Sequence, residues 1–331
     1  MEQYTNVVRD LFDGVIPDLA SGTPPASTTA TATTTAPKVP VSVSSIAFPA
    51  QQARLSLADL DLKTITVALA AGVQQVNLAR PKRGNAFNMQ MWDEYQQVFH
   101  ALQADPHARV VVLSGLGGNF STGMDLSVFA EMQQMAMKEK CEGRRREGLS
   151  RFIQFLQDCV SLPEQCALPV IAAVSGHCIG GAIDVITACD LRYCTKDASF
   201  SIKETDLAIV ADIGTLQRIP KIIGHQRAAE LTYTGRTFSG AEAEKMGLVA
   251  GCFDSEAEMM AHVNAVAAEI ASKSPLTTRG VKRVLLHSRE HTTTQGLEYV
   301  KMWNSAYLLS DDLMEAMRAA MAKEKPTYPR S

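Results

Sequence analysis

The sequence has little of what would place a protein in a membrane, on nucleic acid or around a metal ion. None of its apolar runs reaches the ~18 residues that a membrane-spanning helix requires. A formal net charge of −3 offers no basic surface for nucleic acid. The seven cysteines form no Cys-x-x-Cys pair and the seven histidines are scattered, so we expect no metal site.

What remains is the composition of an ordinary globular chain. Of its 331 residues, 46% are hydrophobic and 20% are charged, which allows one large domain or two smaller ones. Cys178, Cys189 and Cys194 lie among apolar residues, as reduced thiols in a protein core do.

The first 50 residues differ in character from the rest. Residues 21–45 are a low-complexity tract of Ser, Thr, Ala and Pro, with too little apolar surface to offset the entropy lost on ordering. We therefore expect residues 1–50 to form a mostly disordered extension. Residues 1–20 carry four acids against one arginine, unlike a transit peptide, and the chain does not end in the peroxisomal Ser-Lys-Leu.

From residue 51 onward, strand-like and helix-like segments alternate and then give way to a helical tail. This order predicts an α/β core over residues 51–254 and a helical region over residues 255–331. Continuous apolar runs predict strands buried on both faces, and apolar residues at helical spacing predict helices. The expected strands lie within 64–79 (two runs around Ala71-Gly72), 108–115, 168–176, 198–204 and 248–253, and the expected helices within 88–105 and around 149–162.

Three loops contain residues suited to chemistry. Two of them, 115–127 and 175–193, are glycine-rich and follow buried strands, so their backbone can approach a ligand and their free N–H groups attract negative charge. The third, 203–218, holds Glu204, Asp206 and Asp212 in an otherwise apolar stretch. Together they suggest acid–base chemistry beside a backbone site that stabilises an anion.

Each of these features also has a purely structural interpretation. Glycines serve turns, and Asp184 in the first turn of a predicted helix favours the helix dipole. Asp212 precedes Ile-Gly-Thr-Leu-Gln-Arg and suits the cap of a helix. The basic run 138–148 is typical of a solvated helix start.

Four stretches, in this order and spacing, resemble the crotonase, or enoyl-CoA hydratase/isomerase, superfamily. They are ARPKRGNAFN (79–88), NFSTGMDLS (119–127), PVIAAVSGHCIGGAIDVITACDLRY (169–193) and KETDLAIVADIGTLQRIPKIIG (203–224). The resemblance covers residues 64–325 and implies a spiral of ββα units with a C-terminal helical domain, assembled as a homotrimer or a dimer of trimers. It also implies an acyl-CoA thioester substrate, with no cofactor and no metal.

The resemblance assigns an oxyanion hole to the backbone N–H groups of Met124 and Gly181. Asp184, Glu204 and Asp212 become the catalytic acids. Hydratases of this family carry glycine at the position of Asp212, so the trio most resembles the Δ3,5-Δ2,4-dienoyl-CoA isomerase branch. In that reaction Glu204 would remove the C2 proton and Asp212 would protonate C6, while Asp184 would orient the substrate or tune the other two. An enoyl-CoA hydratase or Δ3,Δ2-enoyl-CoA isomerase is the alternative on the same scaffold.

The family pattern further implies contacts to the substrate and its CoA moiety, and a place in fatty-acid β-oxidation in a mitochondrial or peroxisome-like organelle. One branch of the family binds RNA, but the net charge of −3 argues against nucleic acid here. The expected substrate- and CoA-binding residues are Lys82, Arg83, Ala86, Ser121, Gly123, Asp125, Gly180 and Lys282.

Overall fold

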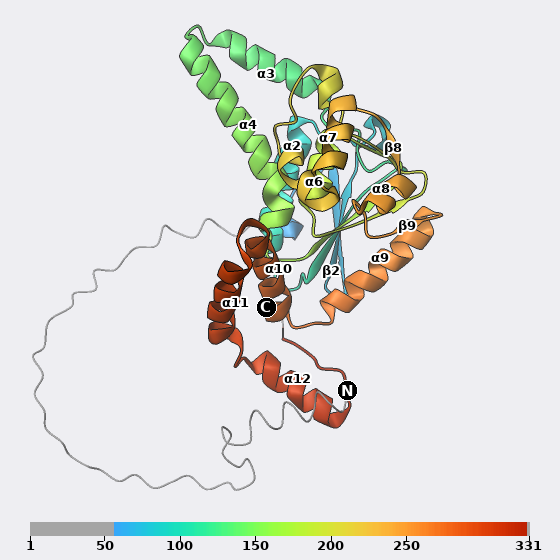
Figure 1. The fold of residues 1–331 in the computed structure, drawn as a ribbon, viewed down its shortest axis with the longest axis vertical. Helices are drawn as coiled ribbons and strands as arrows, with labels where there is room; N and C mark the ends of the chain where they lie inside the picture. The colour runs from blue at the N-terminus through green and yellow to red at the C-terminus, as the bar shows by residue number, and fades with distance from the viewer. Residues whose placement is uncertain (1–55, 330–331) are drawn as a thin grey trace, which may run out of the picture. The chain divides into compact units, whose positions relative to one another are not determined.

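The computed structural model describes residues 56–329, apart from the side chains of residues 135 and 136, so the expectation for residues 1–50 lies outside it. A six-stranded sheet, in the order β1-β2-β3-β4-β6-β9, forms its centre (Figure 1). A smaller sheet has the order β5-β7-β8. The strands are β1 (Ile65–Ala70), β2 (Val73–Leu78), β3 (Val110–Gly115), β4 (Val170–Val174), β5 (His177–Ile179), β6 (Leu191–Thr195), β7 (Ser199–Ser201), β8 (Phe238–Ser239) and β9 (Cys252–Phe253).

The large sheet begins with a hairpin and continues as a parallel sheet. β1 and β2 pair antiparallel through Ala71 and Gly72, whose φ angles of 49° and 82° suit a two-residue hairpin turn. β2, β3, β4, β6 and β9 then pair in parallel. The expected break at Ala71-Gly72 and the expected α/β class are thus confirmed.

Helices and short 3-10 turns fill the rest of the described chain. The α-helices are α2 (Met89–Ala104), α3 (Leu126–Lys138), α4 (Glu142–Gln165), α5 (Gly181–Thr187), α6 (Thr215–Ile223), α7 (His225–Thr234), α8 (Gly240–Met246), α9 (Glu256–Ala271), α10 (Pro275–Glu290), α11 (Thr293–Tyr307) and α12 (Asp311–Ala322). The 3-10 helices are η1 (Leu57–Asp59), η2 (Pro81–Arg83) and η3 (Glu204–Leu207).

Both faces of the sheet are covered, which explains why β4 and the first four residues of β3 are apolar. One face belongs to a large core that includes Trp92 and Phe99 of α2. The opposite face packs against α9, where Met259 and Val263 belong to the same cluster as Val110 and Ile171. The domain boundary at residues 254 and 255 stays a prediction, although the first helix beyond it covers the sheet.

Two expected strands are shorter than their apolar runs. β7 ends at Ser201, because Lys203 adopts a helical backbone conformation and Glu204 begins η3. Because the chain changes direction here, the Glu204 side chain does not follow the alternation of side chains along β7. In the run 248–253, only Cys252 and Phe253 pair as β9.

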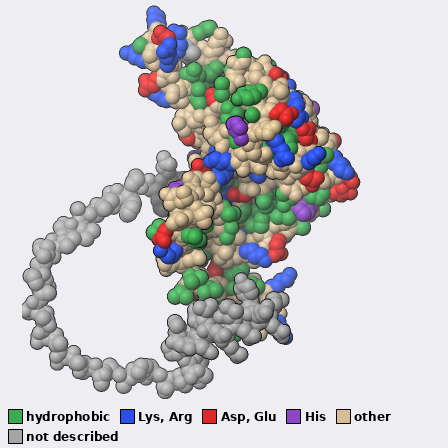
Figure 2. All heavy atoms as spheres, in the orientation of Figure 1, with side chains coloured by type: hydrophobic (Ala, Val, Ile, Leu, Met, Phe, Trp, Pro, Cys, Tyr) green, Lys and Arg blue, Asp and Glu red, His purple; other side chains and the backbone are tan. Residues whose placement is uncertain are grey.

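The basic run near residue 144 lies at the exposed start of α4, as expected for a solvated helix start. Figure 2 shows Lys and Arg side chains gathered at this tip, where the helices α3 and α4 meet. Within residues 56–329, no helix is long and apolar enough to cross a membrane.

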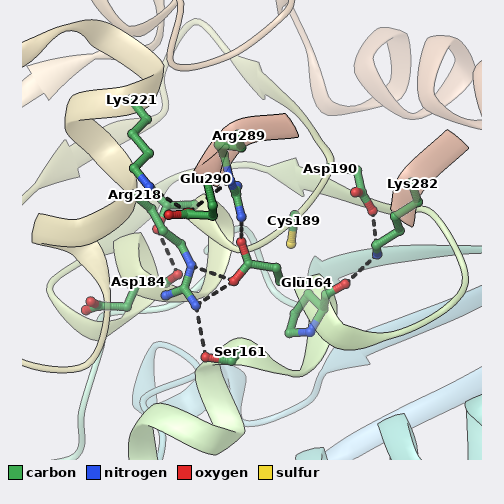
Figure 3. A network of polar contacts seen from close by, with 12 residues as sticks. Ser161, Glu164, Asp184, Cys189, Asp190, Arg218, Lys221, Lys282, Arg289 and Glu290 are labelled. Atoms are coloured by element: carbon green, nitrogen blue, oxygen red, sulfur yellow. Dashed lines mark hydrogen bonds and ion pairs between the residues drawn. The ribbon is translucent and has the colours of Figure 1, made fainter. Parts of the chain in front are cut away.

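Lys282 has a structural role that the sequence analysis did not anticipate. Its side chain on α10 is buried, and its ammonium donates to the carbonyl oxygens of Pro163 (2.6 Å) and Leu168 (2.8 Å) and pairs with Asp190 at 2.7 Å (Figure 3). Lys282 therefore joins α10 to the last turn of α4 and to the segment before β4. Its expected contact with CoA stays a prediction.

Replacing Lys282 should destabilise the fold. Lys282→Met leaves Asp190 and two carbonyl oxygens without their cation, and loss of one partner of a buried pair costs ~3–5 kcal/mol. Urea unfolding measures the change in free energy. Lys273→Met is the control, because Lys273 pairs with Glu269 at an exposed position, where substitution shifts stability by only ~0.5 kcal/mol. Equal stability of the two variants would contradict the structural role of Lys282.

Candidate active site

The first glycine-rich loop is fixed so that one backbone N–H remains available. Phe87 donates its N–H to Gly123 O (2.8 Å) and accepts from Asp125 N–H (2.9 Å), forming an isolated parallel bridge with Met124. Because bonding groups alternate along an extended segment, the Met124 N–H points away from Phe87. Gly123 has φ +89°, and a β-carbon there would clash with Ile179 O and lie 3.3 Å from Gly181 N.

The second loop supplies the matching donor. Gly181 is the first residue of α5, where a helix leaves its N–H groups without a helical acceptor. Met124 N lies 3.8 Å from the position that a β-carbon on Gly181 would occupy. Neither Met124 nor Gly181 donates to a backbone acceptor in the described part of the chain. The two N–H groups therefore lie close together and are free to bind an oxygen.

A pocket of about 270 Å³ opens beside these two donors. Its polar members are few, and Glu204 and Asp212 are the acids among them. The rest of its wall is apolar and comes largely from α3 and α4. The lining includes Leu126, Val128, Phe129, Met132, Leu149, Phe152, Ile153 and Leu156.

Glu204 lines this pocket next to the second glycine-rich loop. A β-carbon on Gly180 would come within 3.3 Å of Glu204 Oε1, so the carboxyl group stands directly beside the second glycine loop. Its Oε2 is buried and has no hydrogen-bond partner among the described residues. Burial raises the pKa of Glu204, and the nearby charge of Asp212 raises it further.

Asp212 lines the same pocket from the segment before α6. Gln157 Nε2 of α4 donates to its backbone oxygen at 2.6 Å, which fixes the chain at this point. The Asp212 side chain is more exposed than that of Glu204, yet partial burial still raises the pKa of Asp212. Its interpretation as a helix cap is wrong, because the cap position of α6 is Gly214 and α6 begins at Thr215.

The carboxylate that does meet the start of α6 is Asp184. It is fully buried, and its Oδ1 accepts the Thr215 N–H at 2.5 Å. Burial, and secondly the charge of Glu204, raise its pKa to about 7. Asp184 is not among the pocket residues. The structure therefore brings Glu204 and Asp212 together at the pocket, whereas Asp184 does not line it. Orientation of the substrate by Asp184 is not supported by this geometry, and its tuning of the other two acids stays a prediction.

The other expected binding residues divide into exposed and structural positions. Lys82 and Arg83 are exposed on η2. Ala86 and Ser121 are buried, and Ser121 Oγ donates to the Asn85 carbonyl at 2.9 Å. Asp125 caps α3 through the Ser127 N–H (3.1 Å) and pairs with Arg80 at 3.0 Å. Their contacts with substrate or CoA stay predictions.

Sequence reasoning missed Asn85, which joins its own loop to the first glycine-rich loop, 115–127. Its side chain is buried, with φ +55°; Oδ1 accepts from Arg80 N–H (2.8 Å), and Nδ2 donates to Leu116 O (2.9 Å) and Asn119 O (2.7 Å). The signal was the Gly-Asn pair at 84–85, since asparagine tolerates positive φ. It also missed Thr215, whose partner lies 31 residues away in the sequence.

The structure adds one observation on metals. His287 of α10 and His291, the residue that ends this helix, have His-x-x-x-His spacing, and their rings stack with centroids 3.8 Å apart. Over residues 56–329, no group of three or more His, Cys, Asp or Glu side chains is arranged to hold a metal ion.

Fold and site together define a class: an α/β protein whose two glycine-rich loops present paired backbone donors to a pocket containing two carboxyl groups. A sequence profile of the family described as Enoyl-CoA hydratase/isomerase matches residues 68–330. The chain belongs to this family, the crotonase superfamily.

Relatives and solved structures agree with this membership. A peroxisomal Delta(3,5)-Delta(2,4)-dienoyl-CoA isomerase of Arabidopsis thaliana is 47% identical over 251 residues, covering 76% of this chain and 90% of that protein. A mitochondrial enzyme of the same name from Mus musculus is 38% identical over 296 residues, covering 86% of this chain and 88% of that protein. The crystal structure of an enoyl-CoA hydratase from Bacillus anthracis superposes with a TM-score of 0.73 at 29% identity, covering 81% of this chain and 100% of that one.

The buried Asp184 predicts a pH dependence of stability. Its pKa is about 7 in the fold against an ordinary 3.8, so the folded state binds the extra proton between these values and loses stability as pH rises through that window. In Asp184→Asn, the amide oxygen keeps the Thr215 contact without a charge. We expect its free energy of unfolding, relative to wild type, to increase from pH 5 to pH 8 in urea titrations. A difference that is constant over this range would contradict the burial argument.

Proposed function

We propose that this protein converts 3,5-dienoyl-CoA to 2,4-dienoyl-CoA in fatty-acid β-oxidation. The observation that carries the proposal is the pair of carboxyl groups, Glu204 and Asp212, lining one apolar pocket beside the Met124 and Gly181 N–H groups. Relatives named as dienoyl-CoA isomerases, at 47% and 38% identity, support the same reaction.

The reaction needs a proton removed at one carbon and returned four carbons away. In our proposal the Glu204 carboxylate takes a proton from C2, and the electron pair spreads through the two double bonds to C6. Asp212 then donates its proton to C6, which leaves double bonds at C2 and C4. Because a single side chain does not easily reach both carbons, two acids in one pocket fit this chemistry.

The raised pKa values suit these roles. Burial raises the pKa of Asp212, which helps it keep a proton to donate near neutral pH. Glu204 has an unpartnered Oε2, which is available to receive a proton. The Met124 and Gly181 N–H groups would stabilise the enolate oxygen, a contribution of about 3–4 kcal/mol for each such donor in other enzymes.

The apolar wall from α3 and α4 would hold the acyl chain, and Lys82 and Arg83 remain our candidates for contacts with CoA phosphates. The substrate is a CoA thioester, and we propose no further cofactor. Relatives named as peroxisomal or mitochondrial support an organelle of one of these kinds. Assembly as a homotrimer or a dimer of trimers remains part of the proposal.

Removing the acid should stop the isomerisation. Asp212→Asn cannot donate a proton to C6, and loss of a general acid lowers rates by ~10²–10⁴-fold. The conjugated 2,4-dienoyl product is followed by ultraviolet absorbance with a 3,5-dienoyl-CoA substrate. Asp206→Asn is the matched control, because Asp206 lies six residues away, pairs with Lys203 and does not line the pocket.

Two results would count against the proposal. Isomerisation by Asp212→Asn at the wild-type rate would remove Asp212 from the role of acid. Loss of enoyl-CoA absorbance through hydration, with no turnover of the 3,5-diene, would favour the hydratase alternative.

Removing the base should stop the first half of the reaction. Glu204→Gln has no carboxylate to accept the C2 proton, so exchange of that proton with deuterated solvent should fall by ~10²–10⁴-fold, together with isomerisation. Exchange is measured by mass spectrometry of recovered substrate. Asp212→Asn should retain the exchange, because its C2 base is intact. Exchange at the wild-type rate in Glu204→Gln would show that another group is the base.

A further inference from the structure

Behind the segment that carries Asp212 lies a second, polar cavity of about 700 Å³. Its walls come from α4, α6 and α10, and Ile213 and Gly214 form the wall nearest the active pocket. Charged side chains from all three helices meet there (Figure 3).

Arg218 of α6 is the central cation of this cluster. Its side chain is only 12% exposed. Its Nη2 donates to Ser161 Oγ (2.9 Å) and Glu164 Oε2 (2.9 Å), and its Nε donates to the same carboxylate oxygen at 3.2 Å. The forked guanidinium thus holds the start of α6 against the C-terminal half of α4.

The remaining nitrogen of Arg218 lies against the backbone that precedes α6. A β-carbon on Gly214 would fall on top of Arg218 Nη1, so the guanidinium occupies the space that a side chain there would need. Gly214 has φ +139° and separates Asp212-Ile213 from Thr215, the residue whose N–H meets Asp184. Arg218 therefore packs on residues 212–215, a short segment with Asp212 at one end and Thr215, the partner of Asp184, at the other.

The cluster extends to the C-terminal helical region. Glu164 also pairs with Arg289 of α10, and Lys221 of α6 pairs with Glu290 at 2.6 Å (Figure 3). The two links differ in burial: the side chains of Lys221 and Glu290 are 41% and 56% exposed, whereas that of Glu164 is 18% exposed. Only the link through Arg218 reaches Gly214.

We infer that Arg218 is a positioning residue for the second proton transfer: held by Glu164 and Ser161, it fixes the Asp212–Thr215 segment so that the Asp212 carboxyl stays at the pocket. This inference rests on the proposed function. Glu204 lies on η3, outside this segment, so the first proton transfer does not depend on Arg218 in the same way. Substitution of Arg218 should therefore slow the protonation of C6 without slowing the removal of the C2 proton.

The test measures both halves in the same variants of the full chain, with 3,5-dienoyl-CoA as substrate. Arg218→Gln removes the charge and the fork, and we expect isomerisation to fall about 100-fold, the effect of a misplacement of ~1 Å, while C2 deuterium exchange stays within about threefold of wild type. Arg218→Lys keeps the charge but cannot span Ser161 and Glu164 together, so it should restore isomerisation only in part.

Two further variants separate positioning from charge and from general stability. Gly214→Ala removes no charge but displaces the guanidinium and strains the backbone at φ +139°, so it should move the same segment and reproduce the selective loss of isomerisation. Lys221→Gln is the matched control, because it removes a cation from the same helix at an exposed ion pair, and both rates should stay at the wild-type level.

The outcomes distinguish this inference from the proposed function. If isomerisation and exchange fall by the same factor in Arg218→Gln and in Gly214→Ala, or if neither falls, the positioning role of Arg218 is overturned. If Asp212→Asn itself isomerises at the wild-type rate, the proposed function fails, whatever the Arg218 variants show. Circular dichroism shows whether each variant folds. If either Arg218→Gln or Gly214→Ala does not fold, the other variant decides the result.

Discussion

The arrangement of the site depends on one buried hydrogen bond, from the Thr215 N–H to Asp184 Oδ1. Asp184 belongs to α5, whose first residue Gly181 has a backbone N–H that is free among the described residues, and Thr215 begins α6, three residues after Asp212. The bond therefore joins the helix that starts at Gly181 to the segment that carries Asp212. The bond requires the Asp184 carboxyl group to be buried away from water. Burial disfavours its charged form and so raises its pKa.

The three acids differ in burial and in their contacts. Asp184 is fully buried and meets the backbone, Glu204 is half-buried beside the glycine loop, and Asp212 is the most exposed. Glu204 and Asp212 line the pocket, where our proposal has them exchange protons with the substrate, whereas Asp184 accepts the Thr215 N–H. The spacing of the three acids in the sequence does not reveal this difference.

How far the sequence could predict this structure depended on how local each feature is. The buried strands β3 and β4 follow from apolar runs, and the Gly180-Gly181 opening of α5 follows from the glycines themselves. The buried contacts of Lys282 were missed and Asp212 was given a cap interpretation because the relevant partners come from distant parts of the chain. The carbonyl partners of Lys282 lie 119 and 114 residues away, and the cap that Asp212 was expected to supply comes from Asp184 instead. The spacing of neighbouring residues in the sequence does not reveal partners that lie so far away.

One helix, α4, lines both the apolar pocket and the polar cavity. Phe152 and Leu156 line the pocket, whereas Ser161 and Glu164, one to two turns further on, hold Arg218. Between them, Gln157 donates to the backbone oxygen of Asp212. In our proposal the apolar wall holds the acyl chain, so a shift of α4 on binding would also move Gln157, Ser161 and Glu164, which contact the Asp212 backbone and Arg218. The proposed chain-binding wall and the proposed placement of the acid thus share one helix.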